Sequence, residues 1–171
     1  MPRLPIVPRG KLPSSLNDTI EQGLDTGVLS TAVPIQVWSH RPEVAQSWLE
    51  TLLALNQSAL LSARERELAR LRVSAITQCQ ACQLARKSDQ VTEEDIACLS
   101  ADDERFTPRE QLAIRFAETF AHDHTALDDE MYQSLGAQFS DPEIAELHLF
   151  CGLMLAGGRV TYALQAYEAS S

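Results

Sequence analysis

The chain has 171 residues, of which 44% are hydrophobic and 22% charged, and its formal net charge is −10 at pH 7. These values are typical of one soluble globular domain. Nucleic acid is not an expected partner, because nucleic-acid binders gather Lys and Arg, whereas the cations of residues 63–72 alternate with Glu65 and Glu67 as on a solvated helix face.

Residues 1–13 are interrupted by prolines and contain no continuous apolar stretch, so we expect an extended arm that lies on the surface or on a neighbouring subunit, and not a secretory signal. We expect residues 14–171 to form one helical domain. Its first helix follows from Leu16, Ile20 and Leu24, which recur every four residues over about residues 14–25. A short helical turn over residues 34–39 and a strongly amphipathic helix over about residues 42–56 come next.

The later helices are indicated by the residues that start them. Ser62-x-x-Glu65 is a capping box, in which two side chains satisfy backbone N–H groups at the helix start. Thr107-Pro108-x-Glu110 is an equally clear helix start, with threonine as N-cap, proline at the first helical position and glutamate at the third. No segment alternates with period two, so we predict an all-α fold with short connections. The expected starts are Ser62, a point near Cys79, Thr92, Thr107, Asp128 and Ser140.

The longest apolar run, Leu147 to Ala156, contains His148 and is too short to span a bilayer. We therefore expect a cytoplasmic protein with no membrane partner. Because thiols stay reduced in that compartment, a Cys-x-x-Cys pair there is more typical of catalysis or metal binding than of a structural disulfide.

Cys79 and Cys82 form such a pair, and they are the residues most suited to chemistry. A structural zinc site needs four ligands, and neither Cys98 nor His122 belongs to a second ligand pair, so we expect no metal. An inert buried pair is the plain alternative, but Cys98 and Cys151, each alone on an apolar helical face, fit that description better. A redox dithiol is the preferred interpretation.

A redox role requires a thiolate, and lowering a cysteine pKa by about two units corresponds to roughly 2.7 kcal/mol. A helix N-terminus supplies about 0.3–1 kcal/mol. Arg86 lies four residues after Cys82, one helical turn on, and a charge about 6 Å away at a dielectric near 20 adds up to about 3 kcal/mol. The alternative for Arg86 is a solvated cation beside Lys87. Glu67, twelve residues before Cys79, is either a proton relay, a partner of Arg86 or an exposed helix acid.

Glu67 followed twelve residues later by Cys79-x-x-Cys82 resembles the carboxymuconolactone decarboxylase and alkylhydroperoxidase (AhpD-like) family, in particular its peroxidase-related members. The helix starts at Thr107 and Ser140 fall where that family has similar segments. The resemblance implies an all-helical subunit that assembles into trimers or hexamers. It also implies that Cys82 attacks a small hydroperoxide and becomes a sulfenic acid, that Cys79 resolves it to a disulfide, and that Glu67 belongs to the proton relay. A thiol protein or small thiol would then reduce the disulfide.

The family pattern continues with a histidine at the position of Arg86, and an arginine cannot accept a proton near neutral pH. Its guanidinium can stabilise a thiolate but cannot act as a base. His124 and His122 are candidate bases if the fold brings them near, and otherwise they are charges that offset a helix dipole.

We therefore predict a thiol-dependent peroxidase or disulfide oxidoreductase with Cys82 as nucleophile and no cofactor. One alternative is a lyase of the decarboxylase type, which handles a lactone acid without a redox dithiol. The other is a non-enzymatic helical assembly with inert cysteines.

Overall fold

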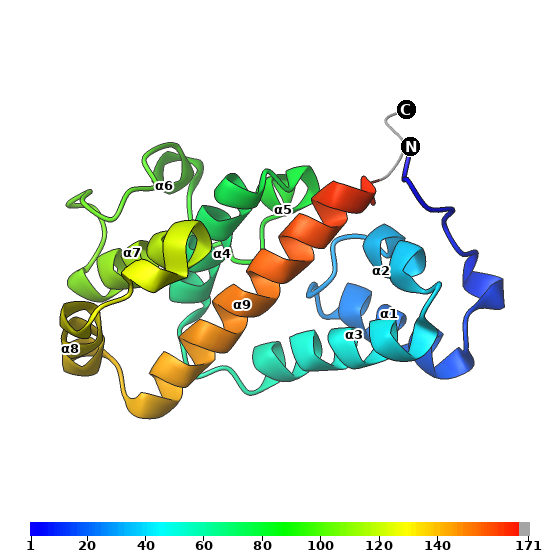
Figure 1. The fold of residues 1–171 in the computed structure, drawn as a ribbon, viewed down its shortest axis with the longest axis horizontal. Coiled ribbons are helices and arrows are strands. Elements are labelled where there is room, and N and C mark those ends of the chain that lie inside the picture. The colour runs from blue at the N-terminus through cyan, green and yellow to red at the C-terminus, as the bar shows by residue number, and fades with distance from the viewer. Residues whose placement is uncertain (168–171) are drawn as a thin grey trace. The chain divides into compact units, whose positions relative to one another are not determined.

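A computed structural model describes residues 1–167, and within them every regular element is a helix (Figure 1). The predicted all-α class is confirmed. The α-helices are α1 (Ser14–Asp25), α2 (Val33–Trp38), α3 (Pro42–Gln57), α4 (Ala63–Thr77), α5 (Gln80–Leu84), α6 (Glu93–Ala97), α7 (Pro108–Asp123), α8 (Asp129–Gln138) and α9 (Asp141–Leu164). Two 3-10 turns, η1 (Arg9–Lys11) and η2 (His124–Ala126), are also present.

The described part of the chain divides into two compact units, the first made of residues 1–58 and 159–167 and the second of residues 59–158. The boundary falls within α9. The predicted division into an arm of residues 1–13 and a domain of residues 14–171 stays a prediction, and residues 168–171 of that domain lie outside the described part of the chain.

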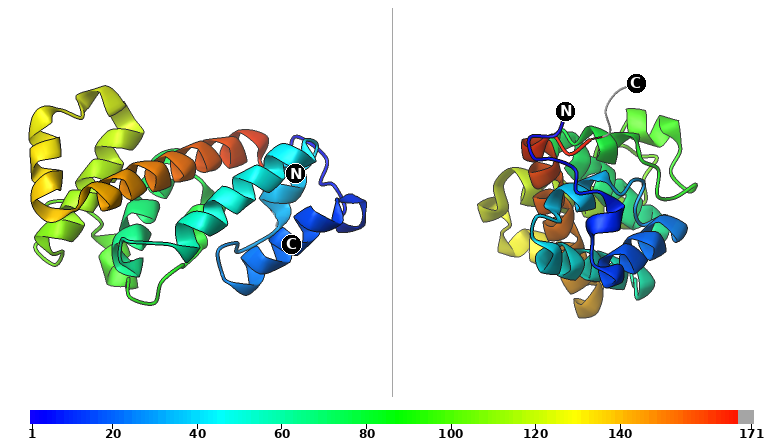
Figure 2. Two further views of the ribbon diagram at one scale, coloured as in Figure 1. Left: turned by 90° about the horizontal axis from the view of Figure 1, so that it is seen from below. Right: turned by 90° about the vertical axis from the view of Figure 1, so that its right-hand side faces the viewer.

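The first unit is built on α3, against which α1 and α2 both pack (Figure 2). Leu16 and Ile20 on α1 and Leu49 on α3 are fully buried in its core, as their helical spacing predicts. The arm is tied to this unit, because Val7 accepts a hydrogen bond from the Gln36 side chain at 3.0 Å. The arm therefore runs over its own unit.

The second unit is organised around α4 and α7, which pack side by side. Arg64 binds Glu110 at 2.8 Å, and Arg72 binds Glu118. From the first ion pair to the second, the residue number rises by eight on α4 and by eight on α7, so the two helices run parallel. Buried core residues of this unit are Leu61, Ala69, Val73, Ala113, Phe116, Ala117, Ala121, Leu135, Phe139, Leu147, Phe150 and Cys151.

In the second unit, the acidic residues that cap the helix N-termini also form ion pairs with other helices. The capping box predicted at Ser62 is present, and the predicted helix starts at Thr92 and Thr107 are capping boxes as well. Each capping acid also meets an arginine of another helix: Arg64 binds Asp95 and Glu110, and Arg109 binds Glu65 and Glu143. Local capping and tertiary packing therefore share the same carboxylates, which sets the helices at defined positions relative to one another within this unit.

The last helix, α9, is longer than the apolar run of the sequence suggested. It has 24 residues, with a mean hydropathy of 1.3 over its most apolar window, so by length and composition alone it could cross a membrane. A core helix of a soluble protein meets the same criterion, and Leu147, Phe150 and Cys151 of α9 are buried in the core of the second unit. The absence of a membrane partner stays a prediction.

Candidate functional site

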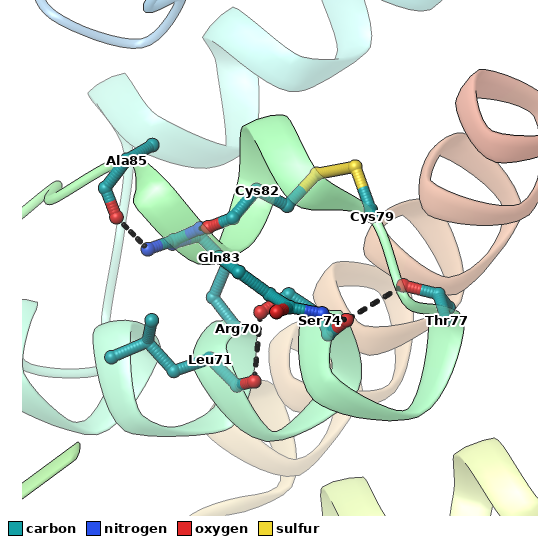
Figure 3. The surroundings of a disulfide bond; sticks show 8 residues. All are labelled: Arg70, Leu71, Ser74, Thr77, Cys79, Cys82, Gln83 and Ala85. Carbon is teal, nitrogen blue, oxygen red and sulfur yellow. Dashed lines mark hydrogen bonds between the residues drawn. A yellow bond between two sulfur atoms is a disulfide. The ribbon is translucent and has the colours of Figure 1, made fainter. Parts of the chain in front are cut away.

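The dithiol lies in the turn that follows α4. Gln78 adopts a left-handed conformation with φ of 54°, which ends α4 and redirects the chain. Cys79 then caps the five-residue helix α5, as expected for a start near Cys79. The two cysteine sulfurs are bonded as a disulfide, with the Cα atoms 5.2 Å apart (Figure 3). One short helical turn therefore brings the two sulfurs together.

The two cysteines differ in exposure. Cys79 is fully buried, whereas Cys82 is half-buried. Gln83 anchors the same turn to α4, because its side-chain amide donates to the Ser74 carbonyl at 3.1 Å. When the pair is reduced, Cys82 is the thiol that a molecule from solvent reaches first.

Glu67 lies under this turn and is almost fully buried, with 2% of its surface exposed. Its two carboxylate oxygens accept hydrogen bonds from Arg70 at 2.7 and 2.8 Å, and one of them also accepts from the backbone N–H of Lys87 at 2.9 Å. The structure thus places Glu67 within the dithiol segment, with Arg70 as its ion-pair partner.

Arg70 is a site residue that the sequence reasoning missed. Its guanidinium, held by Glu67, also donates to the Cys82 carbonyl at 2.5 Å and to the Ala85 carbonyl at 2.8 Å (Figure 3). The signal available in the sequence was the spacing of Glu67 and Arg70, three residues apart on one helix face. What that spacing does not reveal is that α5 folds back onto the same guanidinium.

Arg86 is not one helical turn beyond Cys82, and that premise was wrong. The helix α5 ends at Leu84, and Ala85 is extended with ψ of 141°. The Cys82 and Ala85 carbonyls, which a continuing helix would pair with later N–H groups, are bound by Arg70 instead. The Arg86 side chain is more than one-third exposed and binds Glu93 at 2.7 Å. This bond raises the pKa of Arg86, and the charge of Glu67 adds to the effect.

Lys87 is the titratable cation of this segment whose pKa lies nearest to neutrality. As a whole residue it is exposed, yet burial of its ammonium group, together with the charge of Arg70, lowers its pKa from 10.5 to about 8. Glu67 opposes this shift. A positive group that loses its proton near pH 8 therefore lies close to the buried Glu67–Arg70 pair.

The candidate bases His122 and His124 are both exposed, at the end of α7 and in η2. The parallel register of α4 and α7 places residues 122–124 level with residues 76–78. Both histidines therefore lie at the end of the α4–α7 pair from which the dithiol turn departs. Neither is buried in the way that Glu67 is.

Three further residues considered in the sequence are Cys151, Cys98 and His148. Cys151 is buried, as expected, and burial raises its pKa to about 12. Cys98 is exposed, because α6 ends at Ala97, so the expectation of a buried Cys98 was wrong. His148 is bonded on both ring nitrogens, to the Tyr132 hydroxyl at 2.9 Å and the Ile144 carbonyl at 2.7 Å. In residues 1–167, no cluster of three or more His, Cys, Asp or Glu side chains is placed to hold a metal ion.

Comparison with known folds extends the resemblance noted in the sequence. A protein of unknown function from Agrobacterium tumefaciens, whose name refers to the antioxidant defence protein AhpD, has a TM-score of 0.67 at 20% identity, covering 78% of this chain and 97% of its own. A peroxidase-related protein from Ralstonia eutropha with an alkylhydroperoxidase AhpD core has a TM-score of 0.78 at 17% identity, covering 99% and 93%. The debrominase Bmp8 has a TM-score of 0.79 at 13% identity, covering 96% and 90%.

At these identities the similar structures establish the fold alone. No curated protein matches the sequence. Residues 42–119, which include Glu67, Arg70 and both cysteines of the dithiol, match the sequence model of the carboxymuconolactone decarboxylase family. In this region the chain is similar to the carboxymuconolactone decarboxylase family, and its fold is AhpD-like.

Proposed function

We propose that the protein is a thiol-dependent oxidoreductase that reduces small hydroperoxides, with Cys82 as the attacking residue and Cys79 as the resolving residue. One observation carries the proposal: the two sulfurs are close enough to form a disulfide, while Cys82 is half-buried and Cys79 is fully buried. A reagent from solvent thus reaches the Cys82 sulfur first, and the buried Cys79 sulfur is placed to form the disulfide with it.

The proposed reaction has two steps in the protein. The Cys82 thiolate attacks one oxygen of the hydroperoxide, the O–O bond breaks, and the departing alkoxide takes a proton to leave as an alcohol. Cys82 is then a sulfenic acid. The Cys79 sulfur attacks the Cys82 sulfur, water leaves, and the disulfide forms. An external thiol protein or small thiol supplies two electrons and two protons to restore both thiols.

The alkoxide needs a proton donor, and Arg86 cannot exchange one near neutral pH. We include Glu67, as a part of the proton relay, and His122 and His124, as candidate bases, in the proposal. Glu67 is connected to the dithiol segment by its hydrogen bonds with Arg70 and with the backbone N–H of Lys87, and these contacts support its place in the proposed relay.

The proposal includes self-association into a trimer or hexamer and a cytoplasmic location. Support for self-association comes from α9, because only 28% of its most apolar window is buried and Leu149 within it is 64% exposed; extended apolar surface of this kind commonly marks an interface. Sedimentation of the purified protein tests this part, and a single species of 18.9 kDa at all concentrations would contradict it.

Activity is tested by hydroperoxide consumption with a dithiol as electron donor. Wild type should turn over, Cys82→Ser should lose all protein-dependent consumption, and Cys98→Ser should retain it, because Cys98 is exposed and outside the dithiol. Equal consumption by wild type and Cys82→Ser would refute the proposal. It would leave the lyase reaction, which needs no redox dithiol, or a helical assembly with inert cysteines.

A further inference from the structure

Arg70 is the buried cation that contacts Cys82 directly. Only 8% of its side chain is exposed, and its guanidinium is bonded on both sides. The Nε and Nη2 atoms donate to Glu67, while Nη1 donates to the Cys82 carbonyl at 2.5 Å. The Glu67 carboxylate and the Cys82 carbonyl therefore lie on different edges of one guanidinium.

This arrangement limits how far the positive charge can lie from the Cys82 sulfur. Four covalent bonds separate the carbonyl oxygen and the sulfur of one cysteine, so the two atoms are at most roughly 5 Å apart. With the hydrogen bond added, Nη1 lies within roughly 8 Å of the sulfur. At that range in a half-buried site, solvent screens a charge only partly.

Arg86 is placed less well for the same task. Its guanidinium shares the Glu93 carboxylate through two bonds, at 2.7 and 3.1 Å, and donates to the carbonyls of Gln83 and Ala85. This cation is exposed and paired on its outer side. Water and Glu93 both weaken its field at the sulfur.

We propose that Arg70 is the positioning residue of this dithiol: it fixes the backbone of Cys82 and supplies the positive charge that favours the Cys82 thiolate, a role that Arg86 does not fill. The inference rests on the proposed function. Glu67 holds Arg70 in place from the far edge and reduces its net pull on the thiolate. The Glu67–Arg70 pair thus sets the position of Cys82 and moderates its charge.

The test is the pH dependence of Cys82 alkylation in the reduced full-length protein, with the modified cysteine located by peptide mass. In Arg70→Gln, the midpoint pH of alkylation should rise by about one unit, a tenfold loss of thiolate at pH values below both midpoints. Arg70→Lys keeps the charge and should recover more than half of that shift. Arg86→Gln is the matched control, because the Arg86 guanidinium also donates to backbone carbonyls of this segment, those of Gln83 and Ala85. This variant should move the midpoint by less than about a third of a unit.

A purely structural role for Arg70 predicts a different result. Arg70→Gln would then lower the melting temperature and leave the midpoint unchanged, and this outcome overturns the inference, as does a larger shift in Arg86→Gln. Should Arg70→Gln not fold, Glu67→Gln decides instead. It removes the opposing negative charge and should lower the midpoint, whereas an unchanged or raised midpoint would overturn the inference.

Hydroperoxide turnover, measured on the same samples, separates this inference from the proposed function. Midpoints that shift as expected in a protein that consumes no hydroperoxide would refute the proposed function and leave the role of Arg70 intact. Turnover that depends on Cys82, combined with an unshifted midpoint in Arg70→Gln, would refute the role of Arg70 alone.

Discussion

Gly158 on α9 packs against the end of α4, so the single methyl group added by Gly158→Ala should disturb the dithiol turn that follows α4. A Cβ atom built on Gly158 would lie 2.6 Å from Thr77 Oγ1 and 3.0 Å from Thr77 Cβ. Thr77 is the last residue of α4 and stands two residues before Cys79. The close approach of α9 to the end of α4 therefore requires glycine at this position.

The magnitude follows from two opposing effects in Gly158→Ala. Alanine in a helix interior is favoured over glycine by about 1 kcal/mol. Overpacking costs typically about 1–3 kcal/mol, and contacts this short put the cost at the upper end. We expect a net loss of about 1–2 kcal/mol in the free energy of unfolding, which lowers the melting temperature by roughly 2–8 °C for a chain of this size.

Gly152→Ala is the matched control on the same helix. Its added Cβ would meet only Phe120 Cζ at 3.9 Å, an ordinary contact. This variant should gain about 0.5–1 kcal/mol from helix propensity. Urea denaturation followed by circular dichroism measures both variants, and Thr77→Ala combined with Gly158→Ala should recover part of the loss. A Gly158→Ala protein as stable as Gly152→Ala would refute the reasoning.

Two further predictions concern titratable groups. Arg64 holds the pKa of Asp95 at about 2, below its ordinary 3.8. The resulting contribution to the free energy of unfolding is fully present above about pH 4 and is lost as the pH falls toward 2. Asp95→Asn should therefore lower the free energy of unfolding by up to about 2 kcal/mol at neutral pH and make it depend less on pH between about 4 and 2. Stability equal to wild type at pH 7 would contradict this expectation. Burial raises the pKa of Cys151 to about 12. Cys151 should therefore resist alkylation in the native protein at pH 8 and react only in denaturant, whereas the exposed Cys98 should react in both conditions. Mass spectrometry measures both modifications, and alkylation of Cys151 in the native protein would contradict its burial.

Helix positions were predictable because the signals that set them are local. A capping box and a run of apolar residues with helical spacing involve neighbours in sequence. The helix α1 begins and ends at the predicted residues, Ser14 and Asp25, α3 begins at the predicted Pro42, and α8 follows the predicted cap Asp128. The division into two units was not predicted, because it depends on how α9 packs along its length.

The dithiol was predictable from its spacing, but its surroundings were not. The conformations of Gln78 and Ala85 limit α5 to five residues, and this separates Arg86 from the helical face of Cys82. Arg70 reaches Cys82 only because α5 folds back over α4, a tertiary contact that helix periodicity does not encode. Likewise, Cys98 is exposed because α6 ends one residue before it.

The most direct test of the account is the mass of one tryptic peptide. Cleavage after Arg72 and Arg86 releases both dithiol cysteines in a single fragment, residues 73–86, while Cys98 and Cys151 leave in others. After one equivalent of hydroperoxide is added to the reduced protein, this fragment should lose the mass of two hydrogen atoms in wild type. In Cys79→Ser it should carry one added oxygen on Cys82. An unchanged fragment in wild type, or oxidation that appears only on Cys98, would contradict the account.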